Sequence, residues 1–396
     1  MKYSIFALLS LLVLFSACEK HEIIPATTYE CEMSFAETSN EHPQATDFQA
    51  LIDALTTRLP GVMAGVRTPD GNEWFGTSGF ANIQSEVELD PCHLMMVGSI
   101  SKVLTSTTIF RLQDAGLLSI DDPLKNYLDG PEVDGIAQAK EVTLRQMLNH
   151  TSGLPDYLDN DDLFFRAVNE PFFQLTASEK LEYAYKMDAT HAPGTNYYYS
   201  NTNFVMLGMV IEKLTGKSLD QAKKEYLFDP LQLKNAAVGT PENPIPNRAA
   251  RPYFALNGDK YQDLTEIEVS DAATGDGGVA INTQDLHVFI QSLFEKEFLS
   301  EASFQEMTQS LFVKPEGMAD FPDWKDETSG LGIDLFHTPY GDAYGHTGRI
   351  FAYNAMLFYW PETGATLSLA FNGSSWTDEV ELSKLTLMED FMKLMF

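Results

Sequence analysis

Ser99 and Lys102, in the sequence Ser-Ile-Ser-Lys, are two residues whose types and spacing suit nucleophilic catalysis. On a helix, residues three positions apart share a face, so the hydroxyl and the amine can meet. A serine hydroxyl becomes a good nucleophile when a neighbouring base takes its proton, and burial favours the neutral, basic form of a lysine. A serine at a helix N-terminus also has backbone N–H groups nearby that favour a developing oxyanion. Because about one Ser-x-x-Lys occurs by chance in a chain of this length, a surface pair on a helix is the alternative.

Tyr199-Ser200-Asn201 is a second candidate motif, which follows a Pro193-Gly194 turn and precedes an apolar run at 204–212. A phenol held near Lys102 could share its proton and act as base, or as acid toward a leaving group. The Asn201 amide both donates and accepts hydrogen bonds, which suits a substrate amide. We interpret the neighbouring tyrosines, 197 and 198, as packing residues beneath the start of the helix.

His346-Thr347-Gly348 is the third motif, at the start of a predicted strand over 349–360. Glycine allows a substrate backbone to approach closely, and an edge strand here could hold an extended substrate through main-chain hydrogen bonds. His346 would then face the same pocket as Lys102 and Tyr199 and influence their protonation. A lone histidine is more often structural, so this interpretation depends on the other two motifs.

The elements that must position these motifs form strands near both ends of the chain with helices between them. We expect helices at 48–55, 99–115, 285–296, 300–311 and from 378 to the end, and strands at 61–67, 73–80, 331–336, 349–360 and 366–371. This order predicts an α+β fold, in which the C-terminal strands complete an antiparallel sheet flanked by helices. The α/β lobe would comprise about 47–115 and 272–396, with an inserted, mostly helical lobe at about 116–271.

The N-terminus is typical of an export signal. Lys2 precedes an apolar run at 5–15, which is too short to span a bilayer, and Ser16-Ala17 then precede Cys18. This layout predicts a lipoprotein-type signal peptide at 1–17 and acylation of Cys18, with ordinary signal-peptidase cleavage as the alternative. Residues 18–46 are polar and are expected to form a flexible tether. The protein is therefore expected in the cell envelope, anchored by lipid in the periplasm or at the outer membrane.

Composition excludes some partners and cofactors. The chain has 396 residues, of which 26 are Lys or Arg and 57 are Asp or Glu, and its net charge of −31 argues against nucleic acid. Its 44% hydrophobic residues suffice for a large core. The histidines and cysteines show no metal-ligand spacing, so we expect no metal and no cofactor. Export permits a disulfide between Cys31 and Cys92, with two free thiols as the alternative; the oligomeric state stays open.

The three motifs, in this order and spacing, resemble the serine penicillin-recognising superfamily, which comprises serine β-lactamases, penicillin-binding proteins and esterase relatives. Class C β-lactamases carry Lys-Thr-Gly as the third motif and many family esterases carry Trp-Gly-Gly. His-Thr-Gly with Tyr-Ser-Asn resembles secreted D-alanyl-D-alanine carboxypeptidases of the actinobacterial type. The stretches 148–155 and 276–280 also resemble family segments, which we interpret as loops that shape the cleft. The resemblance extends from residue 47 to the C-terminus and implies a β-lactamase/transpeptidase-like fold.

The resemblance also implies roles for individual residues. Ser99 would form an acyl-enzyme, and Lys102 and Tyr199 would share the acid and base work, with the base left open. His346 stands where other members place a lysine that favours an anionic substrate. Substrate binding would involve Asn201, Thr347, Gly348 and Arg349, of which Arg349 joins Ser99 in an oxyanion hole through its backbone N–H. The Arg349 side chain could bind a substrate carboxylate, or it could point away from the pocket.

These roles predict a cell-envelope serine hydrolase that works on D-amino-acid peptides of the peptidoglycan type, similar to a D-alanyl-D-alanine carboxypeptidase. An esterase or a D-aminopeptidase of the same fold is the first alternative, because substrates diversify on an unchanged site. A β-lactamase is the second alternative, and a non-catalytic penicillin-binding module is the third. The expected partners are a small-molecule or peptide substrate and, through the lipid anchor, a membrane.

Overall fold

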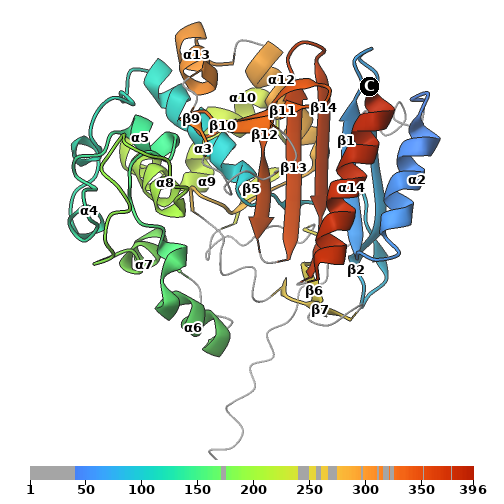
Figure 1. Ribbon diagram of the computed structural model, residues 1–396, viewed down its shortest axis with the longest axis horizontal. Coiled ribbons are helices and arrows are strands. Elements are labelled where there is room, and N and C mark those ends of the chain that lie inside the picture. Colours follow the sequence, from blue (N-terminus) through green and yellow to red (C-terminus); the bar gives the residue numbers. More distant parts are fainter. Residues whose placement is uncertain are drawn as a thin grey trace, which may run out of the picture.

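Nine strands form one antiparallel sheet, in the order β3-β2-β1-β14-β13-β12-β11-β10-β9, in the computed structural model of the chain (Figure 1). The structure describes residues 41–170, 175–239, 249–255, 260–265, 274–295, 298–309, 312–314, 321, 325–350, 352–375 and 377–396. The strands are β1 (Gly61–Arg67), β2 (Glu73–Asn82), β3 (Val87–Glu88), β9 (Phe312–Val313), β10 (Lys325–Ser329), β11 (Asp334–Thr338), β12 (Gly341–Ile350), β13 (Tyr353–Trp360) and β14 (Ala365–Phe371). β1 pairs with β14, so the C-terminal strands complete the sheet as predicted.

Helices cover both faces of this sheet. On one face lie α2 (Ala45–Leu55) and α14 (Asp378–Met395), and on the other lie α3 (Ile100–Asp114) and α12 (Thr283–Glu295). The adjacent residues Trp74 and Phe75 of β2 show this division: Trp74 contacts Phe391 of α14, and Phe75 contacts His287 of α12. Every residue of β13 and β14 is buried, as expected for strands covered on both faces. The predicted α+β fold is confirmed.

A helical region lies to one side of the sheet, beyond α3 (Figure 1). It contains η1 (Leu124–Asn126), α4 (Pro131–Asp134), α5 (Leu144–Leu148), η2 (Tyr157–Asp159), α6 (Asp161–Asn169), α7 (Ala177–Glu182), α8 (Asn201–Thr215), α9 (Leu219–Lys223), the π-helical η3 (Lys224–Phe228) and α10 (Asp229–Leu231). α13 (Glu301–Gln309) lies next to α3. α8 is mostly buried and packs against α3, α5, α7 and α9, so it is the centre of this region.

The helical region ends earlier in the chain than predicted, because short strands follow α10. β5 (Ala236–Val238) joins β4 (Met95–Met96) and β8 (Val279–Ile281), and β6 (Tyr253–Ala255) joins β7 (Tyr261–Asp263) and β15 (Gly373–Ser375). The segment after about residue 235 therefore pairs with strands from the first and last parts of the chain. Runs of two or three residues are too short to show a strand period in sequence.

The predicted strand over 349–360 is confirmed from Tyr353 to Trp360, which is β13, whereas residues 349 and 350 end β12, which pairs with β13 as a hairpin. His346-Thr347-Gly348 consequently lies inside β12 rather than before a strand. The predicted strand at 331–336 is also displaced, since β11 begins at Asp334 and β10 precedes it. Glycines 345 and 348 lack the side chains that mark a strand, so only the apolar part of the hairpin was recognisable.

The folded part begins before residue 47. His42 is buried beside Thr68, and the Gln44 side chain donates a hydrogen bond to the Leu394 carbonyl. The end of the predicted tether therefore packs on the domain. The predicted signal peptide, Cys18 and Cys31 lie outside the described residues; Cys92 is disulfide-bonded. None of the helices that the structure describes is long and apolar enough to cross a membrane.

Candidate active site

Ser99 is the N-cap residue of α3, and Lys102 lies one turn into the same helix. The Lys102 Nζ atom is 2.9 Å from Ser99 Oγ, as the spacing predicted. The Lys102 side chain is 1% exposed, whereas Ser99 is partly exposed. A reachable hydroxyl thus contacts a buried amine, which is the arrangement that an acyl-serine mechanism needs.

The glycine-rich segment from Thr274 to Val279 is bound to α3. Lys102 Nζ donates to the Asp276 carbonyl at 2.7 Å, and Thr105 Oγ1 donates to the Gly275 carbonyl at 2.7 Å. Ser101 Oγ accepts from the Val279 N–H. This segment, which the sequence suggested as a loop at the cleft, therefore fixes the amine of Lys102 from behind.

Two glycines bring β12 against the start of α3. A Cβ atom on Gly348 would lie 1.9 Å from the Val97 carbonyl oxygen and 3.2 Å from the Ser99 nitrogen. Gly98 has φ +50°, and a Cβ atom there would lie 2.6 Å from the Arg349 nitrogen. Only glycine fits either place, so the backbone nitrogens of Ser99 and Arg349 come into one region, as an oxyanion hole requires.

β12 continues beyond its ladder with β11 where it passes the serine. Its register with β11 ends at the pair Asp334–Gly345, whereas its register with β13 continues to Ile350. The ladder with β11 therefore stops one residue before His346, while the ladder with β13 runs past the serine. The addition of an extended substrate to β12 by main-chain hydrogen bonds stays a prediction.

Tyr199 lies immediately before α8, with its ring centroid 5.1 Å from Lys102 Nζ. The ring stacks on His150 at 4.3 Å and lies 6.4 Å from the His346 ring. His150 Nδ1 accepts a hydrogen bond from the Ser200 N–H, and the His150 carbonyl accepts from the Tyr198 N–H. Sequence reasoning singled out the stretch around His150 but missed this role in fixing Tyr199.

The electrostatic environment keeps His150 neutral. Burial, and secondly the Lys102 charge, hold the pKa of His150 well below its usual value. A neutral ring can accept through Nδ1 and stack on a phenol without adding a positive charge beside Lys102.

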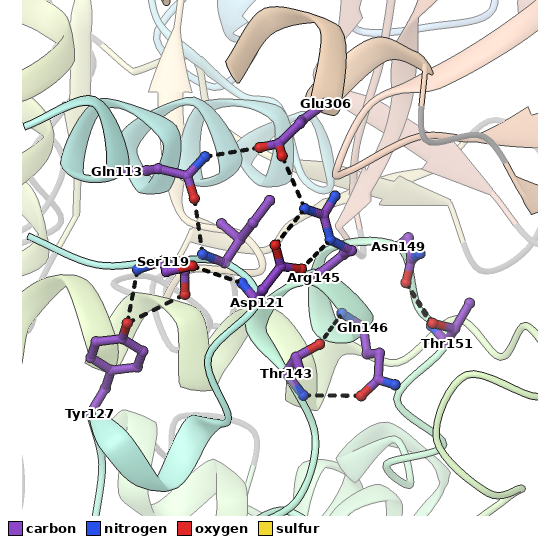
Figure 2. Close-up of polar contacts among 11 residues, drawn as sticks. Gln113, Ser119, Asp121, Tyr127, Thr143, Arg145, Gln146, Asn149, Thr151 and Glu306 are labelled. Carbon is purple, nitrogen blue, oxygen red and sulfur yellow. Dashed lines mark hydrogen bonds and ion pairs between the residues drawn. The ribbon is translucent and has the colours of Figure 1, made fainter. Parts of the chain in front are cut away.

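Polar contacts fix α5, the five-residue helix that precedes His150 (Figure 2). At its start, Thr143 and Gln146 form a capping box. In its first turn, Arg145 pairs with Asp121 at 2.6 Å and with Glu306 of α13 at 3.1 Å. Side chains from three segments therefore hold a helix too short to be stable alone, and with it the turn that carries the stacked histidine.

His346 is 5% exposed, and a buried ionic group lies behind it. Its Nε2 atom is 3.8 Å from Asp334 Oδ2, Asp334 pairs with Lys314 at 2.9 Å, and Lys314 also pairs with Glu327. Burial lowers the pKa of His346, and the Lys314 and Lys102 charges lower it further, although Asp334 opposes them. His346 is thus neutral at pH 7, unlike the lysine that it replaces. Among the residues that the structure describes, no group of three or more His, Cys, Asp or Glu side chains could hold a metal ion.

Asn201, at the first position of α8, is held by a buried carboxylate that the sequence did not indicate. Its Nδ2 atom donates to Asp156 Oδ2 at 2.8 Å, and Leu158 N–H donates to Asp156 Oδ1. Both donors are neutral, so neither balances the carboxylate charge. Burial raises the pKa of Asp156 to about 6, and the charge of Asp159 also raises it. The Asn201 side of the site therefore carries a negative charge at pH 7.

The remaining predicted residues lie along β12. Thr347 is partly buried and Gly348 is buried, whereas Arg349 is exposed. The Arg349 charge acts on Glu381 and Lys384 of α14, which covers the opposite face of the sheet from α3. Its backbone lies at the site, while its side chain is near α14, so binding of a substrate carboxylate by this side chain stays a prediction.

The chain is similar to several known proteins. It matches the Beta-lactamase family over residues 48–387. It is 28% identical over 304 residues to penicillin-binding protein 4* of Bacillus subtilis (strain 168), which is 73% of this chain and 63% of that protein. It therefore covers less than two thirds of that relative's length. It is 27% identical over 341 residues to penicillin-binding protein 4 of Amycolatopsis lactamdurans, which is 82% of this chain and 84% of that protein.

A crystal structure described as a D-stereospecific amidohydrolase from Streptomyces sp. superimposes with a TM-score of 0.69. It is 27% identical, and the match covers 83% of this chain and 94% of that chain. The family match spans all three motifs and all nine strands of the large sheet. The chain therefore belongs to the Beta-lactamase family and has a β-lactamase/transpeptidase-like fold.

Proposed function

We propose that this protein is a cell-envelope hydrolase that cleaves amide bonds at D-amino-acid residues through an acyl-enzyme on Ser99. The observation that carries the proposal is the 2.9 Å contact between the Ser99 hydroxyl and the buried Lys102 amine, beside the glycines of β12. The Streptomyces relative, described as a D-stereospecific amidohydrolase, supports the choice of amide and configuration.

In the proposed reaction, Ser99 Oγ attacks the substrate carbonyl carbon while its proton passes to Lys102 Nζ. The backbone N–H groups of Ser99 and Arg349 stabilise the oxyanion; loss of one such donor costs about 3–4 kcal/mol in comparable enzymes. The C–N bond then breaks, and the leaving amine takes a proton from Lys102 or Tyr199. Water hydrolyses the acyl ester by the reverse proton movements. The contact with Ser99 supports Lys102 as the base, and the Tyr199 ring beside it suits proton transfer to the leaving group.

Peptides that end in D-alanyl-D-alanine are the first candidate substrate. Their support is the combination of Tyr-Ser-Asn with His-Thr-Gly and the two relatives named penicillin-binding protein. Such a substrate adds its acylated amide to the edge of β12 and places that amide near Asn201.

Amides or peptides with a free N-terminal D-residue are the second candidate, and Asp156 favours them. An ammonium group that takes the place of the acylated amide would lie near Asn201 and the uncompensated carboxylate of Asp156. The position of Arg349 near α14 agrees with this candidate, because a substrate that keeps no free carboxylate needs no arginine in the pocket.

The test is a turnover comparison with wild-type protein and Ser99→Ala. The substrates are N-acetyl-D-Ala-D-Ala, D-Ala-p-nitroanilide and their L-enantiomers, with nitrocefin and p-nitrophenyl acetate to detect β-lactamase and esterase activity. We expect Ser99-dependent hydrolysis of at least one D-amide and none of its L-enantiomer. Turnover of p-nitrophenyl acetate alone would make the protein an esterase. A protein that labels with neither fluorescent penicillin nor fluorophosphonate would be a binding module.

We also propose that the protein is exported and anchored through acylated Cys18. The support is the layout of residues 1–18 alone. Wild-type protein is expected in the membrane fraction of cells, and Cys18→Ala in the soluble fraction of the envelope. Equal fractionation of the two proteins would refute the anchor.

A further inference from the structure

Three buried lysines, one of which is Lys102, lie around the glycine-rich segment 274–279. Lys102 on α3, Lys180 on α7 and Lys223 on α9 are 1%, 2% and 0% exposed. The buried carboxylate that interacts with all three is Asp276, in the glycine-rich segment behind Lys102. Burying one amine is costly, so three amines that share one carboxylate require an explanation.

Contacts tie two of the lysines to this segment. Lys102 Nζ donates to the Asp276 carbonyl oxygen at 2.7 Å, and Lys180 Nζ donates to Thr274 Oγ1 at 2.8 Å. The Tyr157 hydroxyl donates to Asp276 Oδ2 at 3.0 Å, and its ring lies 5.7 Å from Lys180 Nζ. The charges of Lys180 and Lys102 lower the pKa of Asp276 against the effect of burial, so Asp276 is ionised.

Lys223 is the third of these buried amines. Its Nζ atom is fully buried and has no hydrogen-bond partner in the part of the chain that the structure describes. Burial lowers the pKa of Lys223 to about 7; Asp276 opposes this effect, and the Lys102 charge adds to it. Because repulsion between two charges is mutual, a protonated Lys223 also favours loss of the proton from Lys102.

We propose that Lys180 and Lys223 are positioning residues whose charges, against the opposing charge of Asp276, keep the Lys102 amine neutral and able to take the proton of Ser99. The inference rests on the proposed acyl-serine reaction and names what activates its base. Asp276 balances one of the two ammonium ions of Lys180 and Lys223, so the one positive charge left over repels a proton on Lys102. Among the described residues, His150 and His346, which are neutral at pH 7, and the Tyr199 phenol also face Lys102.

The test is the pH dependence of Ser99 labelling by a fluorophosphonate, measured as a second-order rate constant on the full chain. Phosphonylation needs the same deprotonation of Ser99 and releases fluoride, so it needs no knowledge of the substrate. Lys223→Met removes a positive charge and is expected to move the acid limb to higher pH by about one unit. Asp276→Asn removes the negative charge and is expected to move it to lower pH. A purely structural role would reduce the rate without opposite shifts.

Lys384→Met is the matched control. Lys384 is also buried, but it pairs with Glu381 on α14, on the far side of the sheet, and its removal should leave the acid limb in place. If Asp276→Asn does not fold, Lys180→Met replaces it and should shift the limb in the same direction as Lys223→Met. The inference would be overturned if the acid limb does not shift in folded variants, or if Lys384→Met shifts it as much as Lys223→Met does. In either case, labelling of Ser99 would still support the proposed function.

A second measurement separates the two proposals if wild-type protein does not label. The titration of Lys102 can be followed by NMR of ¹³Cε-labelled lysine in the full chain, with Lys102→Arg for assignment. Lys223→Met is expected to raise the titration midpoint of the Lys102 signal and Asp276→Asn to lower it. Such shifts without any labelling would reject the proposed reaction but keep the charge cluster; unshifted signals would reject the cluster.

Discussion

At the scale of single residues, the site combines one buried amine, two neutral histidines and one uncompensated carboxylate. Ser99, Lys102 and Tyr199 are recognisable in sequence because chemistry restricts their types and spacing. Asp156 was not recognisable, because its role comes from burial beside Asn201 and not from any motif. Burial is a property of the folded chain, so a carboxylate with a raised pKa has no signature in a single sequence.

Asp156→Asn should raise stability while it lowers activity on free-amine substrates. The pKa of Asp156 in the folded protein, about 6, lies above its value in the unfolded chain. Ionised Asp156 therefore lowers the free energy of unfolding; this cost grows as pH rises from about 4 to 6 and is complete above about pH 6. Two units correspond to about 3 kcal/mol; asparagine cannot keep both hydrogen bonds, so we expect a gain of about 1–2 kcal/mol at pH 8 and none below pH 4. Urea unfolding of wild-type protein and Asp156→Asn at pH 8 and below pH 4 measures this gain in stability. Equal gains at the two pH values would contradict the burial of an ionised group.

The same carboxylate predicts a pH-dependent substrate preference. Below about pH 6, Asp156 becomes protonated and loses its attraction for an ammonium group. The ratio of kcat/KM for D-Ala-p-nitroanilide to that for N-acetyl-D-Ala-p-nitroanilide should therefore fall about tenfold between pH 8 and pH 5, in line with a charged hydrogen bond. The ratio cancels the protonation of Lys102, which affects both substrates. A ratio that stays constant, or one that falls equally in Asp156→Asn, would exclude Asp156 from ammonium binding.

At the scale of elements, the site depends on how closely β12 approaches α3. The sequence predicted α3, β1, β14 and α14 to within a few residues, because each has a clear apolar period or a glycine at its end. The β12–β13 hairpin was misplaced, because the glycines that let β12 touch α3 are the residues that weaken its strand signal. The glycines that allow β12 to approach α3 are therefore also the reason why β12 is hard to predict from the sequence.

Gly348→Ala should abolish acylation of Ser99 with a moderate loss of stability. Its Cβ would lie 1.9 Å from the Val97 carbonyl oxygen, so β12 must move away from α3 and separate the two backbone nitrogens of the oxyanion hole. We expect destabilisation of about 1–3 kcal/mol and a labelling rate reduced at least 100-fold. Gly277→Ala is the control, since nothing lies within 4 Å of its Cβ position although it is in the loop behind Lys102. Equal labelling of the two variants would show that the approach is not needed.

At the scale of the whole molecule, the cleft belongs to neither part of the fold alone. α3 and β12 supply Ser99, Lys102 and the backbone nitrogens, while the helical region supplies Tyr199, Asn201 and Asp156. The chain has a net charge of −31, but its site has a buried cluster of lysines behind Ser99 and the carboxylate of Asp156 beside Asn201. Composition alone argued against nucleic acid as a partner. Which charges lie next to the substrate could be seen only once the packing of the two regions was known.

The disulfide of Cys92 ties the folded domain to another part of the chain, and its removal should lower stability without changing the chemistry. Cys92 is 5% exposed and precedes β4, on the segment that leads to Ser99. A disulfide of this kind stabilises by about 2–4 kcal/mol, so dithiothreitol should lower the Tm of wild-type protein. The Tm of Cys92→Ser should already be low and should not respond to the reductant, while Ser99 labelling at 25 °C stays within about twofold. Peptide mapping under non-reducing conditions identifies the partner, which we predict to be Cys31; a link to Cys18 would exclude acylation of that cysteine and with it the lipid anchor.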